Sequence, residues 1–443
     1  MKGRNLLTMV FSALVIAGLM GTPALAMDWQ QFSGTKLNVL GLEQAQAKGL
    51  KQLIPEFKKL TGIDVEITTM NQTNTMRKVA AELGGRSSTY DVVFVEGDRV
   101  PKFANAGLLE PLDGYFKDST LTDPDVLALD DMIKATMDCF NYKGKQYAMP
   151  FFAACVMMYY RADIFKAKGV NPPETLDDLI PAAKKIHSKE MPFIAMRGQA
   201  GHHNIWHWSQ FLYGYGGQYF KDFPNDLHPN LDTPEAVKAT RVYADLLENY
   251  SIPGAASATY DDVVIAMQQG RVAMVLEGAP LGARILDPKR SRVVGKVGFG
   301  VVPRGPKGVF PPFTAQAYLI NAASKHKKAA YLFLQWFTSF DTLKKVSLIA
   351  NHVAVTRKSL WNDADFIKKY NFDYGHGNYL KAFQKTLELG YPHYRLPLEQ
   401  WPQIVDVVGR AVQETYVGKK TPEQAMKYSN KAMTKIMKRA GKI

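Results

Sequence analysis

The sequence predicts an α/β fold in which parallel strands alternate with helices. Over the first part of the chain, short apolar segments and helix-like segments follow one another in β–α–β–α–β order. This order is typical of a parallel sheet with helices on both faces. Residues 92–95 are apolar at four consecutive positions, as expected for a strand that is covered on both faces. No low-complexity linker separates domains, which matches an interpretation with two lobes that exchange strands, because the crossings would then form the hinge.

The expected elements follow from the periodicity of apolar residues. The expected strands are residues 37–40, 65–69, 92–95, 156–165, 272–276 and 318–321. The expected helices are residues 49–60, 75–83, 176–187 and 234–249, and from Lys327 onward the chain is expected to be almost entirely helical. Pro402 and Pro422 lie near expected helix starts, where proline is tolerated.

A secretory signal peptide is predicted over residues 1–26. Lys2 and Arg4 precede a largely apolar run at residues 6–20, and a small-residue A-L-A sequence ends at Ala26. A basic start, a short apolar core and an A-x-A site are typical of cleaved signal peptides. The run is too short for a convincing membrane span, and no later segment approaches the required length. We expect cleavage after Ala26. The residue directly after that site is Met27 and not a cysteine, so this is not a lipoprotein signal, and we expect a freely soluble product in the periplasm.

The size and charge of the mature chain limit its function. Removal of 26 residues from the 443-residue chain leaves 417, enough for two or three domains with full cores. The formal net charge falls from +14 to +12, because Lys2 and Arg4 leave and no acidic residue does. The lysines are scattered along expected helices, and the sequence has no arginine-rich block and no nucleic-acid-binding motif. Solvated helix faces therefore explain the charge, and we expect no nucleic-acid partner.

The chain has two cysteines, Cys139 and Cys155, and two interpretations are open. The sequence Lys143-Gly144-Lys145 reads as a turn between two strand-like runs, so a hairpin return would bring the sulfurs together. Closing a loop of this size stabilises a protein by roughly 3 kcal/mol in the chain-entropy model. Two buried free thiols are the alternative. We favour a disulfide between Cys139 and Cys155.

Common catalytic motifs are absent from the sequence. It contains no H-E-x-x-H, no G-x-S-x-G and no G-x-x-x-x-G-K-[ST] motif. Gly298 and Gly300 begin a partial dinucleotide-binding pattern, but Pro303 stands where the third glycine is needed. We expect no cofactor and no enzymatic activity, and paired carboxylates for glycoside hydrolysis are the open alternative.

Residues 201–217, GHHNIWHWSQFLYGYGG, form the most unusual polar cluster. His203 and His207 lie one helical turn apart and are candidate metal ligands, together with His202. No nearby cysteine or glutamate completes a ligand set, which argues against a metal site.

The aromatic residues of the same cluster favour a sugar ligand. Its tryptophans and tyrosines are Trp206, Trp208, Tyr213 and Tyr215. Aromatic faces pack against the C–H faces of sugar rings, whereas core packing is the alternative for some of the four. On a helix, Trp206 and Trp208 point to different sides, so we expect only one of them to face a ligand.

The strand at residues 92–95 runs into Glu96, Gly97, Asp98 and Arg99. In open α/β sheets, ligands bind at the carboxyl ends of the parallel strands, so this polar end is a candidate binding rim. A solvated loop with a surface ion pair is the alternative.

Six blocks, in order along the mature chain, carry a family resemblance. They are FKKLTGIDVEI, YDVVFVEGDRVPKFANAGLLEPLD, GKQYAMPFFAACVMMYYRADIFKAKGVNPPETLDDL, MQQGRVAMVLEG, YLINAASKHKKAAYLFLQWF and GKKTPEQAM. Together they resemble the extracellular solute-binding proteins of ABC importers, in the branch that includes the maltodextrin-binding protein. The resemblance covers essentially the whole mature chain.

The resemblance implies a set of binding residues. In that branch the corresponding strand end supplies an Asp-Arg pair that hydrogen-bonds sugar hydroxyls, and the matching pair here is Asp98 and Arg99. Gln44 and Asn204 fall at positions of acidic ligand contacts, and Trp206 falls at a stacking tyrosine. The expected substrate-binding residues are Gln44, Glu96, Asp98, Arg99, Asn204, Trp206, Glu277, Gln316 and Trp401.

Departures from the family pattern imply a small ligand. Val95 stands where the relative has a tryptophan, Ala154 replaces an acid and Ala45 replaces a lysine. Pro280 stands where an aromatic residue would stack a second sugar ring. A pocket without these groups should not hold a long maltodextrin, so we expect a monosaccharide, a sugar alcohol or a disaccharide. Trp401 either supplies the missing stacking face or belongs to the core.

We therefore predict a two-lobed periplasmic binding protein, each lobe an α/β sheet flanked by helices, with the ligand cleft between the lobes. Residues 36–152 and 318–353 would form the first lobe, and residues 153–312 and 354–443 the second. The protein would act as a monomer that delivers a small sugar or sugar alcohol to the membrane subunits of an ABC importer. The alternatives are a secreted carbohydrate-active enzyme, or a binding protein for another solute such as a metal, held by Tyr159, Tyr160 or the histidines.

Overall fold

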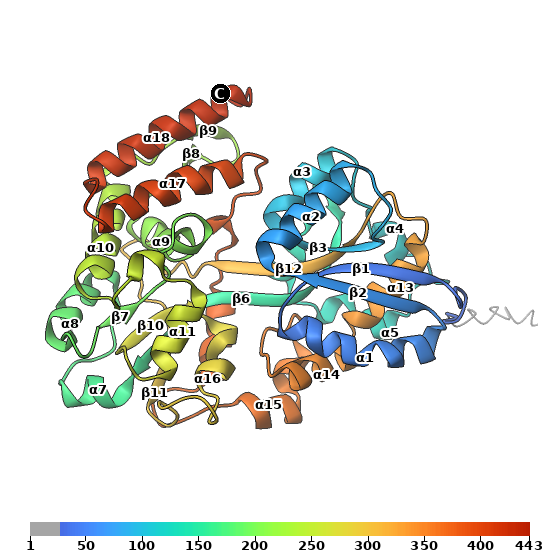
Figure 1. The fold of residues 1–443 in the computed structure, drawn as a ribbon, viewed down its shortest axis with the longest axis horizontal. Coiled ribbons are helices and arrows are strands. Elements are labelled where there is room, and N and C mark those ends of the chain that lie inside the picture. Colours follow the sequence, from blue (N-terminus) through green and yellow to red (C-terminus); the bar gives the residue numbers. More distant parts are fainter. Residues whose placement is uncertain (1–26) are drawn as a thin grey trace, which may run out of the picture.

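The computed structural model describes residues 27–443, and the predicted signal peptide at residues 1–26 lies outside them. Two lobes lie side by side, and the long strands β6 (Ala148–Arg161) and β12 (Phe313–Ile320) run between them (Figure 1). The predicted α/β fold of two lobes is therefore confirmed.

The first lobe begins with the predicted β–α–β–α–β unit. Strand β1 pairs in parallel with β2, from Lys36 with Asp64 to Leu42 with Met70, and in parallel with β3. The strands and main helices of this unit are β1 (Lys36–Leu42), α1 (Ala45–Thr61), β2 (Asp64–Met70), α2 (Gln72–Gly84) and β3 (Val92–Glu96). Short elements complete the lobe: α3 (Val100–Asn105), α4 (Asp113–Phe116), α5 (Pro124–Leu127), α6 (Lys134–Asp138), β4 (Asn141–Tyr142) and β5 (Lys145–Gln146). After β12 the chain returns to this lobe in α13 (Lys327–Phe337) and α14 (Phe340–Ala350), and α14 packs against α1.

The second lobe is built on the far half of β6. Strand β6 pairs antiparallel with β10 and β11, and β10 pairs in parallel with β7. The strands of this lobe are β7 (Ile194–Ala195), β8 (Phe220–Asp222), β9 (Asp226–Pro229), β10 (Met274–Gly278) and β11 (Val297–Val301). Its helices are α7 (Ala162–Ala167), α8 (Leu179–Ile186), α9 (His202–Tyr215), α10 (Pro234–Asn249), α11 (Tyr260–Gln268), α12 (Gly282–Ile285), α16 (Tyr379–Glu388), α17 (Trp401–Tyr416) and α18 (Pro422–Arg439). Helix α15 (Ala364–Tyr370) lies between α14 and α16 along the chain and contacts both.

The two crossing strands form one continuous ladder. Residues Phe313 to Leu319 of β12 pair with Cys155 to Ala148 of β6, and a register shift interrupts the ladder between Gln316 and Ala317. Strand β6 then changes partner, because its next residue, Val156, pairs with β10. The same β-strand is thus hydrogen-bonded into the sheets of both lobes.

Local sequence signals set several helix ends. Helix α1 ends at Gly62, which has a φ of 68° and donates its N–H to the carbonyl of Lys58. A side chain there would be strained at that φ and would meet Ser33, so glycine suits the position. Helix α18 begins with Thr421, which forms a capping box with Gln424, and Pro422 follows in the first turn.

Most predicted elements are present, with longer bounds than expected. Helix α10 has the predicted ends, and the first five elements of the chain contain the predicted segments. The expected strand at residues 156–165 is wrong in its last part, because β6 ends at Arg161 and α7 begins at Ala162. Arg161 and Asp163 form an ion pair at this change of structure, with Nε 2.8 Å from Oδ1.

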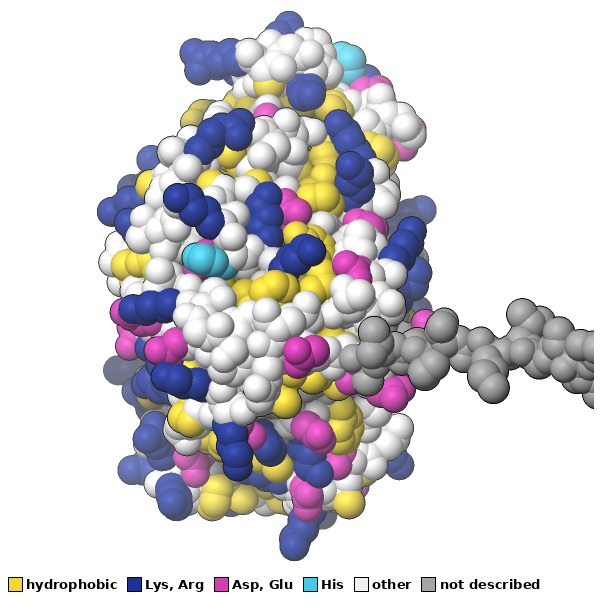
Figure 2. Space-filling model, turned by 90° about the vertical axis from the view of Figure 1, so that its right-hand side faces the viewer, with side chains coloured by type: hydrophobic (Ala, Val, Ile, Leu, Met, Phe, Trp, Pro, Cys, Tyr) yellow, Lys and Arg dark blue, Asp and Glu magenta, His cyan; other side chains and the backbone are white. Residues whose placement is uncertain are grey.

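The surface and the helices add two observations. On the face shown in Figure 2, lysine and arginine side chains are dispersed among acidic and apolar ones. This agrees with the predicted scatter of positive charge along helices. Within residues 27–443, no helix is both long and apolar enough to cross a membrane.

The predicted disulfide is wrong, because Cys139 and Cys155 are both free. The hairpin of β4 and β5 does form, and it pairs Asn141 with Gln146. This register places Cys139 opposite the start of β6. Cys155 lies seven residues farther along that extended strand, a distance of about 23 Å at the usual strand rise.

We predict that both thiols react with iodoacetamide in denaturant without prior reduction. In the native protein they should react slowly, because burial raises the pKa of Cys139 to about 12 and raises that of Cys155 well above its ordinary value. Intact-mass measurement counts the added groups. Two thiols that react only after reduction would show that the disulfide exists.

Candidate functional site

A cavity of about 1010 Å³ lies between the two lobes and is lined by both. From the first lobe it receives Gln44, Gln72 and Glu96, which follow or end the parallel strands β1, β2 and β3. From the second lobe it receives Trp206 and Arg197, among others. The carboxyl ends of parallel strands meet at one edge of a sheet, which explains why three separate segments converge here.

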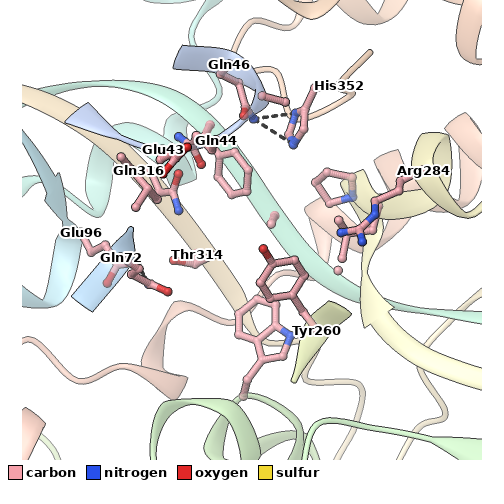
Figure 3. Close-up of a pocket in the computed structure, with 18 of the residues that line it drawn as sticks. Glu43, Gln44, Gln46, Gln72, Glu96, Tyr260, Arg284, Thr314, Gln316 and His352 are labelled. Carbon is pink, nitrogen blue, oxygen red and sulfur yellow. Dashed lines mark hydrogen bonds between the residues drawn. The ribbon is translucent and has the colours of Figure 1, made fainter. Parts of the chain in front are cut away.

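The first-lobe wall is rich in amides. Figure 3 shows Gln44 and Gln316 close together, with Gln72 and Glu96 beside them. Gln72 Nε2 donates to Glu96 Oε1 at 3.2 Å. Gln44 precedes α1 without capping it through its side chain, and Gln316 Oε1 is buried without a hydrogen-bond partner among the described residues. Amides that are not used in packing are suited to hydroxyl groups, because they offer both donors and acceptors.

Arg395 crosses from the second lobe to the first. It follows the 3₁₀ helix η7 (Pro392–Tyr394), which packs on α9, and its Nη1 lies 2.8 Å from Glu96 Oε2 and 3.5 Å from Asp98 Oδ1. Its Nη2 lies 2.9 Å from a ring nitrogen of His202 on α9. Burial lowers the pKa of Arg395, but Glu96 and Asp98 outweigh burial and raise the pKa above its ordinary value. The guanidinium therefore stays charged although it is only 10% exposed.

A second buried ion pair supports the opposite wall. Arg197 Nε donates to Glu277 Oε2 at 2.9 Å, and a second bond joins Arg197 Nη2 to Glu277 Oε1. Glu277 is fully buried and also accepts the N–H of Gly278 at 2.6 Å. The guanidinium of Arg197 lies 5.6 Å from the ring centres of Trp206 and Tyr260. This pair thus fixes the side of the cavity that carries the aromatic rings.

Two of the three histidines of α9 are bound to protein groups, and His203 Nδ1 is buried without a partner among the described residues. His202 contacts Arg395, and His207 Nδ1 accepts the backbone N–H of Arg197 at 2.9 Å. Burial, followed by neighbouring arginines, lowers the pKa of His202 and His207 well below the ordinary value, and burial lowers that of His203 to about 4. No group of three or more His, Cys, Asp or Glu side chains in residues 27–443 is arranged to hold a metal ion. The metal alternative therefore finds no support in the described part of the chain.

Trp206 and Trp208 lie on opposite sides of α9. Trp206 lines the cavity, packs edge-on against Tyr394 with ring centres 4.7 Å apart, and has no partner for its buried Nε1 within residues 27–443. Trp208 is fully buried, and its Nε1 donates to Thr240 Oγ1 at 3.1 Å. The helix thus carries one tryptophan toward the cavity and one into the core.

The structure brings four of the nine expected residues to the cavity wall. These four are Gln44, Glu96, Trp206 and Gln316. Asp98 and Arg99 lie outside the wall, and Arg99 Nε is 3.6 Å from Asp98 Oδ2. Because Asp98 faces Arg395, its carboxylate is occupied by the protein.

The other three expected residues lie in packed interior positions and correct the prediction. Asn204 is fully buried, and its Nδ2 donates to the carbonyl of Gly409 at 2.6 Å. Glu277 is engaged with Arg197. Trp401 is 1% exposed and packs edge-on against Tyr219, so it belongs to the core of the second lobe.

Several residues of the cavity wall were not predicted from the sequence. Arg197 follows the short strand β7, so the strand-end rule that identified Glu96 would also have found it. Arg395 lies outside every family-like block and far in sequence from its partners, so only the fold places it here.

Three of the four departures from the family pattern, Ala45, Ala154 and Pro280, line the cavity, whereas Val95 is buried and is not part of the cavity wall.

Comparisons with known proteins agree with this geometry. Residues 41–341 match the family model of the bacterial extracellular solute-binding proteins. The mannitol-binding protein of Pseudomonas aeruginosa is 26% identical over 385 residues, which are 82% of this chain and 84% of that protein. Two solved solute-binding proteins of ABC transporters are each 28% identical and are covered over 99% of their length. The one from Agrobacterium radiobacter, in complex with ribitol, has a TM-score of 0.80 and covers 91% of this chain, and the one from Agrobacterium vitis, with bound D-mannitol, has a TM-score of 0.79 and covers 92%.

The match to the family model spans more than half of the chain, and the structural likeness covers more than nine tenths of it. The protein therefore belongs to the bacterial extracellular solute-binding proteins.

Proposed function

We propose that this protein captures a small sugar or sugar alcohol in the cavity between its lobes and delivers it, in the periplasm, to the membrane subunits of an ABC importer. One observation carries the ligand class. The cavity wall holds a buried donor, Trp206 Nε1, and a buried acceptor, Gln316 Oε1, that find no partner within residues 27–443. Buried polar groups are normally hydrogen-bonded, and a hydroxyl group is able to satisfy either of these two.

The wall also favours a compact ligand. Ala45, Ala154 and Pro280 supply small or flat surfaces instead of charged or aromatic platforms. The relatives named above with mannitol and ribitol support a ligand of this size. Trp206 and Tyr260 provide aromatic surface for the C–H groups of such a molecule.

The proposed capture step is a hinge closure. We assign residues 36–152 and 318–362 to one rigid body, because Thr356, Arg357 and Ser359 hydrogen-bond to residues of the first lobe and the 3₁₀ helix at Ser359–Asn362 packs on α14. This moves the end of the first body beyond residue 353, the boundary expected from the sequence. Residues 153–312 and 363–443 would form the other body, with the protein acting as a monomer. The change of partner of β6 between Cys155 and Val156 supports a hinge close to the boundary after residue 152. Binding of ligand to both walls would favour the closed form, which would then dock on the importer.

We predict that a small sugar alcohol or monosaccharide raises the melting temperature of the mature protein. A ligand that binds only the folded state at 100 times its Kd adds about 2.7 kcal/mol of stability, which corresponds to a shift of several degrees. Differential scanning fluorimetry against monosaccharides, sugar alcohols, disaccharides and maltodextrins measures it. A shift with long maltodextrins alone would contradict the small-ligand proposal, and no shift with any of these compounds would contradict the sugar-binding function.

We predict that Trp206→Phe weakens binding of the ligand found in this screen by about fivefold. Phenylalanine keeps an aromatic ring but removes the indole N–H, so a ligand hydroxyl loses one hydrogen bond, which is worth about 1 kcal/mol. Isothermal titration calorimetry measures the affinity.

Trp208→Phe is the matched control, because the bond that it removes joins two protein groups, Trp208 and Thr240. It should lower the melting temperature without ligand and leave the affinity unchanged. Equal affinity losses in both variants, or none in Trp206→Phe, would show that the indole of Trp206 does not bind the ligand.

A further inference from the structure

The arginines that line the cavity are paired with carboxylates of the protein. Four arginines lie on its wall, and each has a carboxylate partner. The pairs are Arg197 with Glu277, Arg284 with Asp261, Arg290 with Asp287 and Arg395 with Glu96. Glu43 adds a further carboxylate at the exposed rim. The wall thus offers an anionic ligand no guanidinium that lacks a carboxylate partner.

The pair of Arg197 and Glu277 is the most completely buried of the four. The side chain of Arg197 is 11% exposed and that of Glu277 is not exposed at all. Two hydrogen bonds join the guanidinium and the carboxylate, so the Nε–Nη2 edge of Arg197 is occupied and its charge is neutralised by Glu277. Glu277 lies behind the wall, whereas Arg197 is part of it.

Two neutral polar groups on the same wall lack a hydrogen-bond partner among the described residues, whereas the arginines of the wall have carboxylate partners. Trp206 Nε1 and Gln316 Oε1 are the buried donor and acceptor already described, and Trp206 lies beside Arg197. An uncharged polyol satisfies these two atoms without disturbing an ion pair. A carboxylate or phosphate would have to lose its hydration next to Glu96 and Glu277 and would gain no free cation in return, which is unfavourable.

We infer that Glu277, which does not line the cavity, determines its charge selectivity: by neutralising Arg197 it makes the cavity accept uncharged polyols and reject the corresponding acids. This inference rests on the proposed function and assigns to Glu277 an indirect role in place of ligand contact. Removal of its charge frees a guanidinium on the wall and should admit an acidic ligand.

The test compares polyols with aldonates of the same carbon chain, namely mannitol with mannonate and ribitol with ribonate. The mature protein is first freed of bound ligand by unfolding and refolding, and calorimetry then gives each affinity at low salt. The pair used is the one whose polyol binds wild type more tightly. Wild type should bind that polyol at least 100-fold more tightly than the corresponding aldonate. In Glu277→Gln this ratio should fall at least tenfold because aldonate binding improves, and the gained affinity should weaken from 50 to 500 mM NaCl, since it depends on charge.

Asp163→Asn is the matched control. Its partner Arg161 is also 11% exposed and also makes two bonds to the carboxylate, but this pair lies beside α7 and outside the cavity wall. The control removes one negative charge from the protein and should leave the ratio of polyol to aldonate affinity unchanged. A fall equal to that in Glu277→Gln would show that net charge alone acts, which would overturn the inference.

Breaking a buried ion pair strongly destabilises many proteins, so a second variant covers the case in which Glu277→Gln does not fold. Glu277→Asp keeps the carboxylate but shortens the side chain, so its pairing with Arg197 weakens, and it should improve aldonate binding relative to the polyol by a smaller factor. An unchanged ratio in the variant that folds overturns the inference, as does a wild type that binds aldonates as tightly as polyols. In both cases sugar-alcohol binding stands, whereas a wild type that binds neither member of the pairs and no neutral sugar refutes the proposed function itself.

Discussion

The antiparallel ladder between β6 and β12 is the constraint on which the rest of the structure depends. It runs from Phe313 with Cys155 to Leu319 with Ala148 and continues into the sheets of both lobes. Side chains alternate along a strand, and two alternating pairs, Phe152 with Ala154 and Thr314 with Gln316, reach the cavity. The strands that join the lobes are therefore also the floor of the site. The register shift beside Gln316 falls within this floor, in keeping with the frequent position of β-bulges next to binding sites.

Arg395 links the two lobes through charge. Its carboxylate partners, Glu96 and Asp98, are fixed at the end of β3 in the first lobe, whereas its own chain segment packs on α9 of the second. All three side chains are at most 10% exposed. A buried carboxylate without its cation is costly, so the segment that carries Arg395 has to remain against the end of β3 for this cluster to stay buried, and η7 also contacts the crossing strand β12. The neutral state of His202 beside Arg395 follows from the same burial.

The fold was largely predictable from the sequence, and the site only in part. Parallel strands and amphipathic helices leave local periodic patterns, so β1 to β3 and α10 were found at nearly their true positions. Glu96 was found because a strand end is visible in the sequence. Arg395 was not, because its position depends on a return of the chain 299 residues after Glu96. The disulfide prediction failed for a related reason: the loop length was known, but the length and direction of β6 were not.

Three of the five failures within the predicted site have a common physical cause, which is competition between protein groups and ligand for the same polar atoms. Asp98 and Glu277 have the chemistry of sugar-binding carboxylates, but arginines occupy them. Asn204 has the chemistry of a hydroxyl-binding amide, but its donor is used by Gly409. The sequence shows which side chains are able to bind a hydroxyl, and only the packed structure shows which of them remain available. By this criterion Trp206 and Gln316 mark the binding surface better than any charged residue, because burial has removed their access to water without supplying a protein partner among the described residues.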